Sequence, residues 1–149
     1  MYPTDVIKCN LLFYYLLLCA WTHYPHILLV EDNELNMEIA QYLLEDAGAV
    51  VTKAFDGKQA VDLFAQNPAG TVDVILMDVM MPVMNGIEAA KAIRLMDRSD
   101  ARTITIIAMT ANAFDEDRQA TRNAGMNAHL SKPLDGKEVL RVISGSSRQ

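Results

Sequence analysis

Short apolar runs alternate along this chain with longer segments whose apolar residues recur every three or four positions. The apolar runs lie at 26–30, 50–55, 72–77, 104–109 and 126–131. The segments with helical spacing follow them at 33–48, 57–66, 85–97, 113–124 and 135–143. A short apolar run is typical of a strand buried on both faces, as in a parallel sheet. The alternation therefore predicts an α/β fold: a doubly wound, five-stranded parallel sheet with right-handed crossovers.

Composition sets the first 25 residues apart. Met1–Pro25 holds both cysteines, the single tryptophan and an unbroken apolar run, Leu11–Trp21. As a helix this run would span about 16 Å, roughly half of a ~30 Å hydrocarbon core, so it is short for a transmembrane helix. Three interpretations stay open: a weak signal or membrane-associating segment, an upstream region outside the natural domain, or an element packed on it. We expect a leader at 1–25, one domain at 26–144 and a flexible tail at 145–149.

Charge and cysteine content narrow the function classes. The 149 residues carry a net charge of −6, which argues against a nucleic-acid partner because an acidic surface repels a phosphate backbone. Two cysteines are too few for a disulfide-dense secreted scaffold. The chain contains neither a Walker loop nor a G-x-G-x-x-G motif, so nucleotide binding is disfavoured.

Polar residues stand where four of the predicted strands end. In an open α/β sheet, ligands bind outside the carboxyl ends of the strands, so these side chains are expected to converge. The set comprises Glu31, Asp32, Asp78, Thr110 and Lys132. Each of these residues alone has an ordinary structural explanation, such as a solvated turn, a helix cap or a surface charge. Their order at successive strand ends of one sheet is what makes the set specific.

The chemistry of this set favours a phosphoryl site. Two carboxylates about 4 Å apart repel each other by roughly 4 kcal/mol at an effective dielectric of 20, and a bound cation relieves that repulsion. An all-oxygen site with few protein ligands suits Mg²⁺. Lys132 adds a positive charge for a phosphoryl dianion, and Thr110 adds a hydroxyl. The acceptor is then a carboxylate itself, since aspartate can form an acyl phosphate.

Four segments resemble receiver domains of two-component response regulators. They read Ile27-Leu-Leu-Val-Glu-Asp-Asn33, Val74-Ile-Leu-Met-Asp-Val-Met-Met-Pro-Val-Met-Asn-Gly86, Ile107-Ala-Met-Thr-Ala-Asn112 and His129-Leu-Ser-Lys-Pro133. The resemblance runs from about 26 to 143 and is closest to receivers of hybrid histidine kinases. It implies the (βα)5 flavodoxin-like receiver fold. The leader matches nothing in that family.

The resemblance implies roles by position. Asp78 is the phosphoacceptor, Asp32 a direct Mg²⁺ ligand and Glu31 a ligand through water. The backbone carbonyl of Met80 completes the metal site.

The remaining roles concern the phosphoryl group and the loops. Thr110 closes on the phosphoryl group, and Lys132 pairs with one of its oxygens. A cis peptide bond is implied between Lys132 and Pro133. Pro82 and Gly86 shape the loop after the phosphoacceptor.

His129 stands where the family often has Tyr or Phe as a rotating switch. Strand alternation places its side chain on the outward face, opposite to Lys132. We expect Thr110 and His129 to couple phosphorylation to the surface of the last two helices and the fifth strand, with some pH dependence near neutrality. A passive surface role for His129 is the alternative.

Together these features predict a phosphorylation-switched signalling module. It would accept a phosphoryl group from phosphohistidine on a histidine kinase or a histidine phosphotransfer protein, and catalyse only its own phosphorylation and dephosphorylation. Apart from phosphodonors we expect no small-molecule substrate, and a weak homodimer is left open. The expected location is the cytoplasm, although the leader keeps membrane association open.

Two other functions compete with this prediction. A Mg²⁺-dependent phosphohydrolase similar to haloacid-dehalogenase phosphatases needs a second Asp where this chain has Met80. A receiver-like fold that only binds a partner would not need Asp78, Thr110 and Lys132 together.

Overall fold

Five parallel strands form a single sheet. The computed structural model describes residues 24–111 and 115–146. The strands are β1 (His26–Val30), β2 (Val50–Ala54), β3 (Val74–Asp78), β4 (Thr105–Thr110) and β5 (Ala128–Ser131), in the order β2–β1–β3–β4–β5. The helices are α2 (Glu34–Asp46), α3 (Gly57–Gln66), α4 (Gly86–Arg94), α5 (Asp115–Asn123) and α6 (Gly136–Ser146). The predicted fold class is confirmed.

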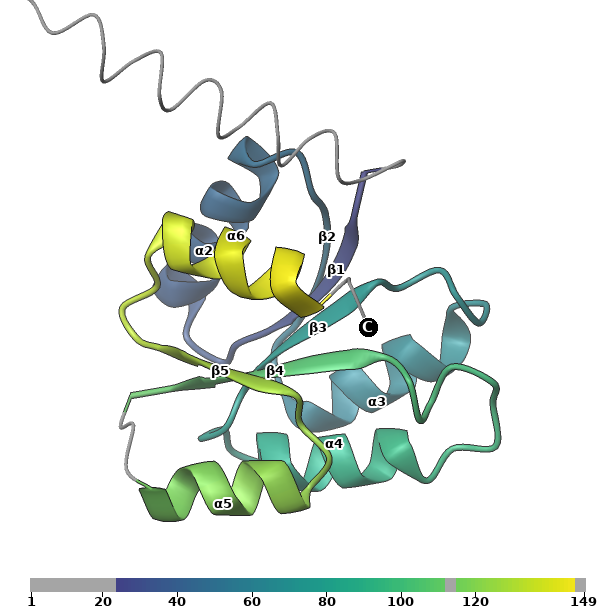
Figure 1. The fold of residues 1–149 in the computed structure, drawn as a ribbon. Coiled ribbons are helices and arrows are strands. Elements are labelled where there is room, and N and C mark those ends of the chain that lie inside the picture. Colours follow the sequence, from purple (N-terminus) through teal and green to yellow (C-terminus); the bar gives the residue numbers. More distant parts are fainter. Residues whose placement is uncertain (1–23, 112–114, 147–149) are drawn as a thin grey trace, which may run out of the picture.

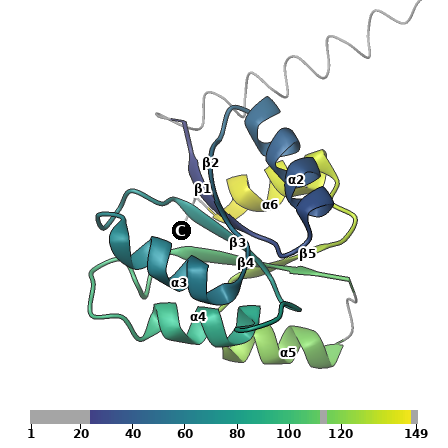
Figure 2. The same ribbon diagram turned by 180° about the vertical axis from the view of Figure 1, so that it is seen from behind.

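Helices cover both faces of the sheet. The ribbon views place α2 and α6 on one face and α3, α4 and α5 on the other (Figures 1 and 2). Successive strand residues point to opposite faces, so each strand contributes to two cores. Leu28 and Ile75 join the core beneath α3 and α4, whereas Leu29 and Leu76 join the core beneath α2 and α6. Burial on both faces explains the nearly continuous apolar runs of the sequence.

Some element boundaries differ from the predicted ones. The third helix was expected to reach Asp97, but α4 ends at Arg94 and the chain then turns back. The last helix was expected to stop at Ile143, but α6 continues to Ser146, and the Ser144 hydroxyl donates to the Leu140 carbonyl at 2.7 Å. The flexible tail expected at 145–149 is therefore wrong for residues 145 and 146, which belong to α6. The serine-rich composition predicted a flexible segment, but the helix that precedes these residues continues through them.

The leader and the end of the tail lie outside the described residues, except for Tyr24 and Pro25. The Pro25 carbonyl accepts a hydrogen bond of 2.8 Å from the Val50 N–H at the start of β2. None of the helices in the described ranges combines the length and the apolar character needed to cross a bilayer.

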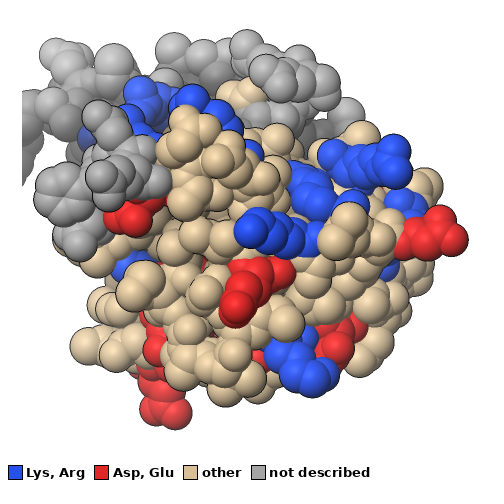
Figure 3. Space-filling view, turned by 90° about the horizontal axis from the view of Figure 1, so that it is seen from below, with Lys and Arg blue, Asp and Glu red and all other residues tan. Residues whose placement is uncertain are grey.

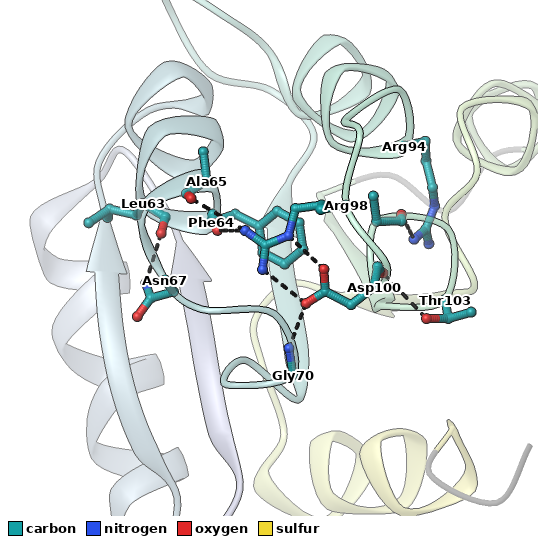
Figure 4. A network of polar contacts seen from close by, with 10 residues as sticks. Leu63, Phe64, Ala65, Asn67, Gly70, Arg94, Arg98, Asp100 and Thr103 are labelled. Carbon is teal, nitrogen blue, oxygen red and sulfur yellow. Dashed lines mark hydrogen bonds and ion pairs between the residues drawn. The ribbon is translucent and has the colours of Figure 1, made fainter.

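The segment between α4 and β4 is fastened to the end of α3 (Figure 4). The Arg98 guanidinium forms an ion pair with Asp100 at 2.6 Å and donates to the Phe64 carbonyl. It also lies over the Phe64 ring, 4.1 Å from the centroid. Asp100 in turn accepts the Gly70 N–H at 2.8 Å. This network joins the end of α3 to the loop before β4, at the strand ends opposite to those that carry Asp78. It fixes a connection that has no regular structure of its own.

Candidate functional site

Three carboxylates meet at the carboxyl ends of β1 and β3. Glu31 and Asp32 directly follow β1, and Asp78 is the last residue of β3, the neighbouring strand. Each offers an oxygen that lies within 4.8 Å of the other two. Glu31 and Asp78 are buried, whereas Asp32 is exposed at the rim. The convergence expected from the sequence is therefore found.

Lys132 reaches into this cluster from the end of β5. Its Nζ lies 2.6 Å from Glu31 Oε2 and 3.0 Å from Asp78 Oδ2. The backbone of Lys132 is fixed by its N–H, which donates to the Thr110 carbonyl at 2.8 Å. The peptide bond to Pro133 is cis, as the resemblance implied. Lys132 is thus a half-buried partner of two carboxylates rather than a free surface charge.

Burial and charge act against each other at Asp78. Desolvation raises the pKa of Asp78 to about 6, although the hydrogen bond and the charge of Lys132 oppose the rise. For Lys132, burial lowers the pKa, but the hydrogen bonds and charges of Glu31 and Asp78 outweigh it, so the pKa is raised. The cluster therefore holds a carboxylate whose negative charge is poorly compensated. A divalent cation bound by the three carboxylates would compensate it, and their oxygen donors suit Mg²⁺.

The loop after Asp78 is closely packed against it. The Met80 N–H donates to Asp78 Oδ1 at 3.3 Å, and the Gly86 N–H donates to the Val79 carbonyl at 3.0 Å. A Cβ atom on Gly86 would lie 2.2 Å from the Asp78 carbonyl oxygen, so only glycine fits at the start of α4. Pro82 lies in this loop, as expected, and Thr110 is buried at the end of the next strand, β4.

His129 lies away from the cleft. Its register partner on β4 is Ala108, which belongs to the core beneath α3 and α4, so His129 faces that side of the sheet. Its Nε2 is hydrogen-bonded to the hydroxyl of Thr121, a fully buried residue of α5. The predicted separation from Lys132 is correct, and the ring is half-buried against α5. Its part in the switch stays a prediction. No pattern in the sequence pointed to Thr121.

The tautomer of His129 follows from its partner. The Thr121 hydroxyl donates to the Arg118 carbonyl at 3.0 Å, so it must accept from an Nε2–H of the imidazole. Burial, followed by the charges of Arg118 and Arg122, lowers the pKa of His129. Figure 3 looks onto the side of the molecule that carries α4 and α5, where Lys and Arg side chains lie intermixed with carboxylates. The charge change expected near neutrality therefore moves to lower pH.

Acidification should destabilise the contact between His129 and α5. The folded-state pKa is lowered, so the unfolded chain binds the proton more readily, and stability falls as pH drops below about 6.5. Between pH 7.5 and 5.5, the wild type should lose more free energy of unfolding than His129→Gln, whose amide can still donate to Thr121. Equal losses in urea titrations of the two proteins would contradict this role for His129.

Comparisons with known proteins concern the domain that carries this site. The family of response regulator receiver domains matches residues 27–144. Hybrid signal transduction histidine kinase I of Dictyostelium discoideum is 37% identical over 120 residues, covering 79% of this chain and 7% of that protein. Sensor protein GacS of Pseudomonas syringae is 35% identical, over 80% of this chain and 13% of that protein. The chain thus spans a small part of these multidomain relatives.

Two solved structures share the fold and part of the sequence. The receiver domain of sensor histidine kinase PA1611 from Pseudomonas aeruginosa, with a magnesium ion in its active-site cleft, is 37% identical. It has a TM-score of 0.76 and covers 85% of this chain and all of that one. The receiver domain of Saccharomyces cerevisiae Ssk1, in complex with the histidine phosphotransfer protein Ypd1, is 27% identical, with a TM-score of 0.73 over 83% of this chain and 89% of that one.

Proposed function

The chain belongs to the response regulator receiver family of two-component systems, and from this we propose that Asp78 accepts the phosphoryl group. The observation that carries the proposal is the buried Asp78 carboxylate, 3.0 Å from Lys132 and within 4.8 Å of two further carboxylates. A carboxylate oxygen of Asp78 would attack the phosphorus, and the phosphohistidine nitrogen would leave. Lys132 is placed to bind an oxygen of the transferred phosphoryl group, and the Thr110 hydroxyl is placed to close on the same group.

Glu31 and Asp32 would hold Mg²⁺ together with Asp78 and the Met80 carbonyl. The cluster fits this ion because its donors are oxygens and because Asp32, at the rim, leaves room for water ligands. Bound Mg²⁺ would neutralise charge on the transferring phosphoryl group. We further propose that the domain turns over no diffusible substrate other than phosphodonors. We infer a cytoplasmic location from this donor and ion requirement.

The simplest experiment is to incubate the protein with acetyl phosphate and measure its intact mass. With Mg²⁺ we expect the mass to rise by one phosphoryl group, and with EDTA we expect no rise. An unchanged mass with Mg²⁺ would contradict the proposed function. A gain that persists in Asp78→Asn would assign the phosphoryl group to another residue.

The outer face of α2 is the proposed docking surface for the phosphohistidine donor. Leu35, Ile39 and Tyr42 follow i, i+4, i+7 spacing and are 65%, 49% and 71% exposed, so they form one apolar stripe. The helix starts beside the cleft, directly after Asp32 and its N-cap Asn33. A helical partner lying on this stripe could present a histidine to Asp78. The Ssk1 receiver is found in complex with the histidine phosphotransfer protein Ypd1, which supports a protein as the donor.

Removing the stripe should slow transfer from a protein donor and spare transfer from a small one. For Leu35→Ala combined with Ile39→Ala, we expect transfer from phosphorylated Ypd1 to slow by about tenfold or more, because exposed apolar anchors carry much of the energy of such interfaces. The rate with acetyl phosphate should stay unchanged. Leu95→Ala, at a residue that is 85% exposed and remote from the cleft, is the matched control. Equal slowing in the control would contradict the docking surface.

A further inference from the structure

The start of α3 contacts the loop that follows Asp78. The Gly57 N–H donates a hydrogen bond of 3.1 Å to the Met84 carbonyl oxygen. A Cβ atom on Gly57 would lie only 2.4 Å from that oxygen, well inside van der Waals contact. Gly57 is buried, and it is the first residue of α3 rather than part of the loop itself. The approach of the two backbones therefore requires glycine at this position.

The neighbouring Val83 lies at a tight turn of this loop, closed by a 2.9 Å hydrogen bond from the Met84 N–H to the Pro82 carbonyl. Its φ is +69°, in the left-handed region that β-branched residues rarely adopt. The Val83 side chain is 84% exposed, so its own packing does not compensate for this conformation. The next residue does have compensating contacts: the Met84 carbonyl meets Gly57, and the Met84 side chain packs against the core beneath α3 and α4.

The same loop carries groups that the proposed chemistry uses. Met80 lies four residues before Met84, and its N–H contacts the Asp78 carboxylate. Gly86 fixes the other end of the loop against the Asp78 carbonyl. The Gly86 contact lies at the loop's own end, whereas the Gly57 contact comes from the start of α3.

We propose that Gly57 is a positioning residue for phosphorylation. Its contact with the Met84 carbonyl sets the conformation of residues 80–84 and so places Met80 beside Asp78. Gly57 contacts no reacting atom and acts through Met84. This inference rests on the proposed role of Asp78 as the phosphoacceptor.

Gly57→Ala tests the proposal. The new methyl group must push the Met84 carbonyl away by about half an ångström or more, and misplacing a reacting group by about 1 Å can cost on the order of 100-fold in rate. We expect phosphorylation by acetyl phosphate to slow by about tenfold or more and the apparent Kd for Mg²⁺ to rise several-fold. Gly136→Ala is the matched control, because Gly136 also starts a helix after Asp, but its nearest neighbour is Leu43 Cδ2 at 3.5 Å. That variant should behave as the wild type.

A second substitution separates positioning from general damage. Val83→Gly removes the left-handed strain, so the Met84 carbonyl can yield to the new methyl group without displacing Met80. In the Gly57→Ala background it should restore most of the rate and of the Mg²⁺ affinity, and it should also restore folding if Gly57→Ala alone does not fold. The effect of the double variant on the phosphorylation rate then differs clearly from the sum of the two single effects.

The outcomes distinguish the inference from the proposed function. A wild-type rate and Mg²⁺ affinity in Gly57→Ala would overturn the inference and leave the proposed function intact, even if the variant were less stable. Failure of Val83→Gly to restore the double variant would also overturn it. Failure of the wild type to gain a phosphoryl group would instead overturn the proposed function.

Discussion

Replacing Asp78 by Asn should stabilise the protein at pH 7 in the absence of Mg²⁺. Burial raises the pKa of Asp78 from 3.8 to about 6, so its ionised form is disfavoured in the folded state. A shift of this size corresponds to at most about 3 kcal/mol, and because Asn also loses the ion pair with Lys132, we expect a gain of about 1–3 kcal/mol. Urea unfolding in EDTA measures this gain.

The gain should depend on pH in a defined direction. Because the folded-state pKa is raised, the folded protein binds this proton more readily than the unfolded chain, and the ionised carboxylate destabilises the fold as pH rises through about 6. The difference between Asp78→Asn and the wild type should be largest at pH 7 and should nearly close toward pH 4. Asp97→Asn, at an exposed carboxylate, should show no such difference. A difference that is constant with pH would contradict the assignment of Asp78 as the poorly compensated charge.

Without Mg²⁺ we expect Asp78→Asn to be more stable than the wild type, and Mg²⁺ should reverse this order. An ion that binds the folded state alone stabilises it by mass action, so the Tm of the wild type should rise with Mg²⁺. Asp78→Asn and Asp32→Ala each remove a proposed ligand, and their Tm should respond much less. Equal Tm increases in all three proteins would place the ion elsewhere.

Arg98→Ala should destabilise the fold by about 2–3 kcal/mol, because it removes an ion pair, carbonyl hydrogen bonds and a ring contact together. Arg98 holds Asp100 through two bonds, of 2.6 and 3.0 Å, and this pairing raises the pKa of Arg98 and lowers that of Asp100 (Figure 4). The variant leaves the carbonyls of Phe64 and Ala65 without their guanidinium partner. For a domain of this size, Tm should fall by about 6–12 °C.

Arg102→Ala is the control for this loop, since Arg102 is exposed in the same connection. It should change Tm by little, as most exposed substitutions do. Arg98→Lys keeps the charge but not the planar fork, so it should recover only a small part of the loss. If Arg98→Ala were as stable as Arg102→Ala, the network would not hold this connection in place.

The strand-end residues could be predicted from the sequence because parallel strands place their carboxyl ends at one edge. That rule brings Asp32, Asp78 and Lys132 together although more than fifty residues separate the last two. Asp56, which follows β2 at the same edge, caps α3 instead: its side chain accepts the Gln59 N–H at 2.8 Å.

Contacts that a helix makes with a neighbouring loop or strand could not be predicted from the order of the strands. The approach of Gly57 to the Met84 carbonyl and the bond between His129 and Thr121 depend on how helices seat on the sheet, and the strand pattern does not specify this. The same limit explains why α4 ends early, because Arg98 turns back to contact the end of α3.

The central claim, phosphorylation at Asp78, is tested most directly by locating the phosphoryl group. The protein is incubated with acetyl phosphate and Mg²⁺, and borohydride then reduces the acyl phosphate to a stable alcohol. After digestion, tandem mass spectrometry should find the reduced side chain at Asp78 in the Mg²⁺ sample and not in the EDTA sample. A reduced side chain at Glu31 or Asp32, or none at any carboxyl group, would contradict the claim.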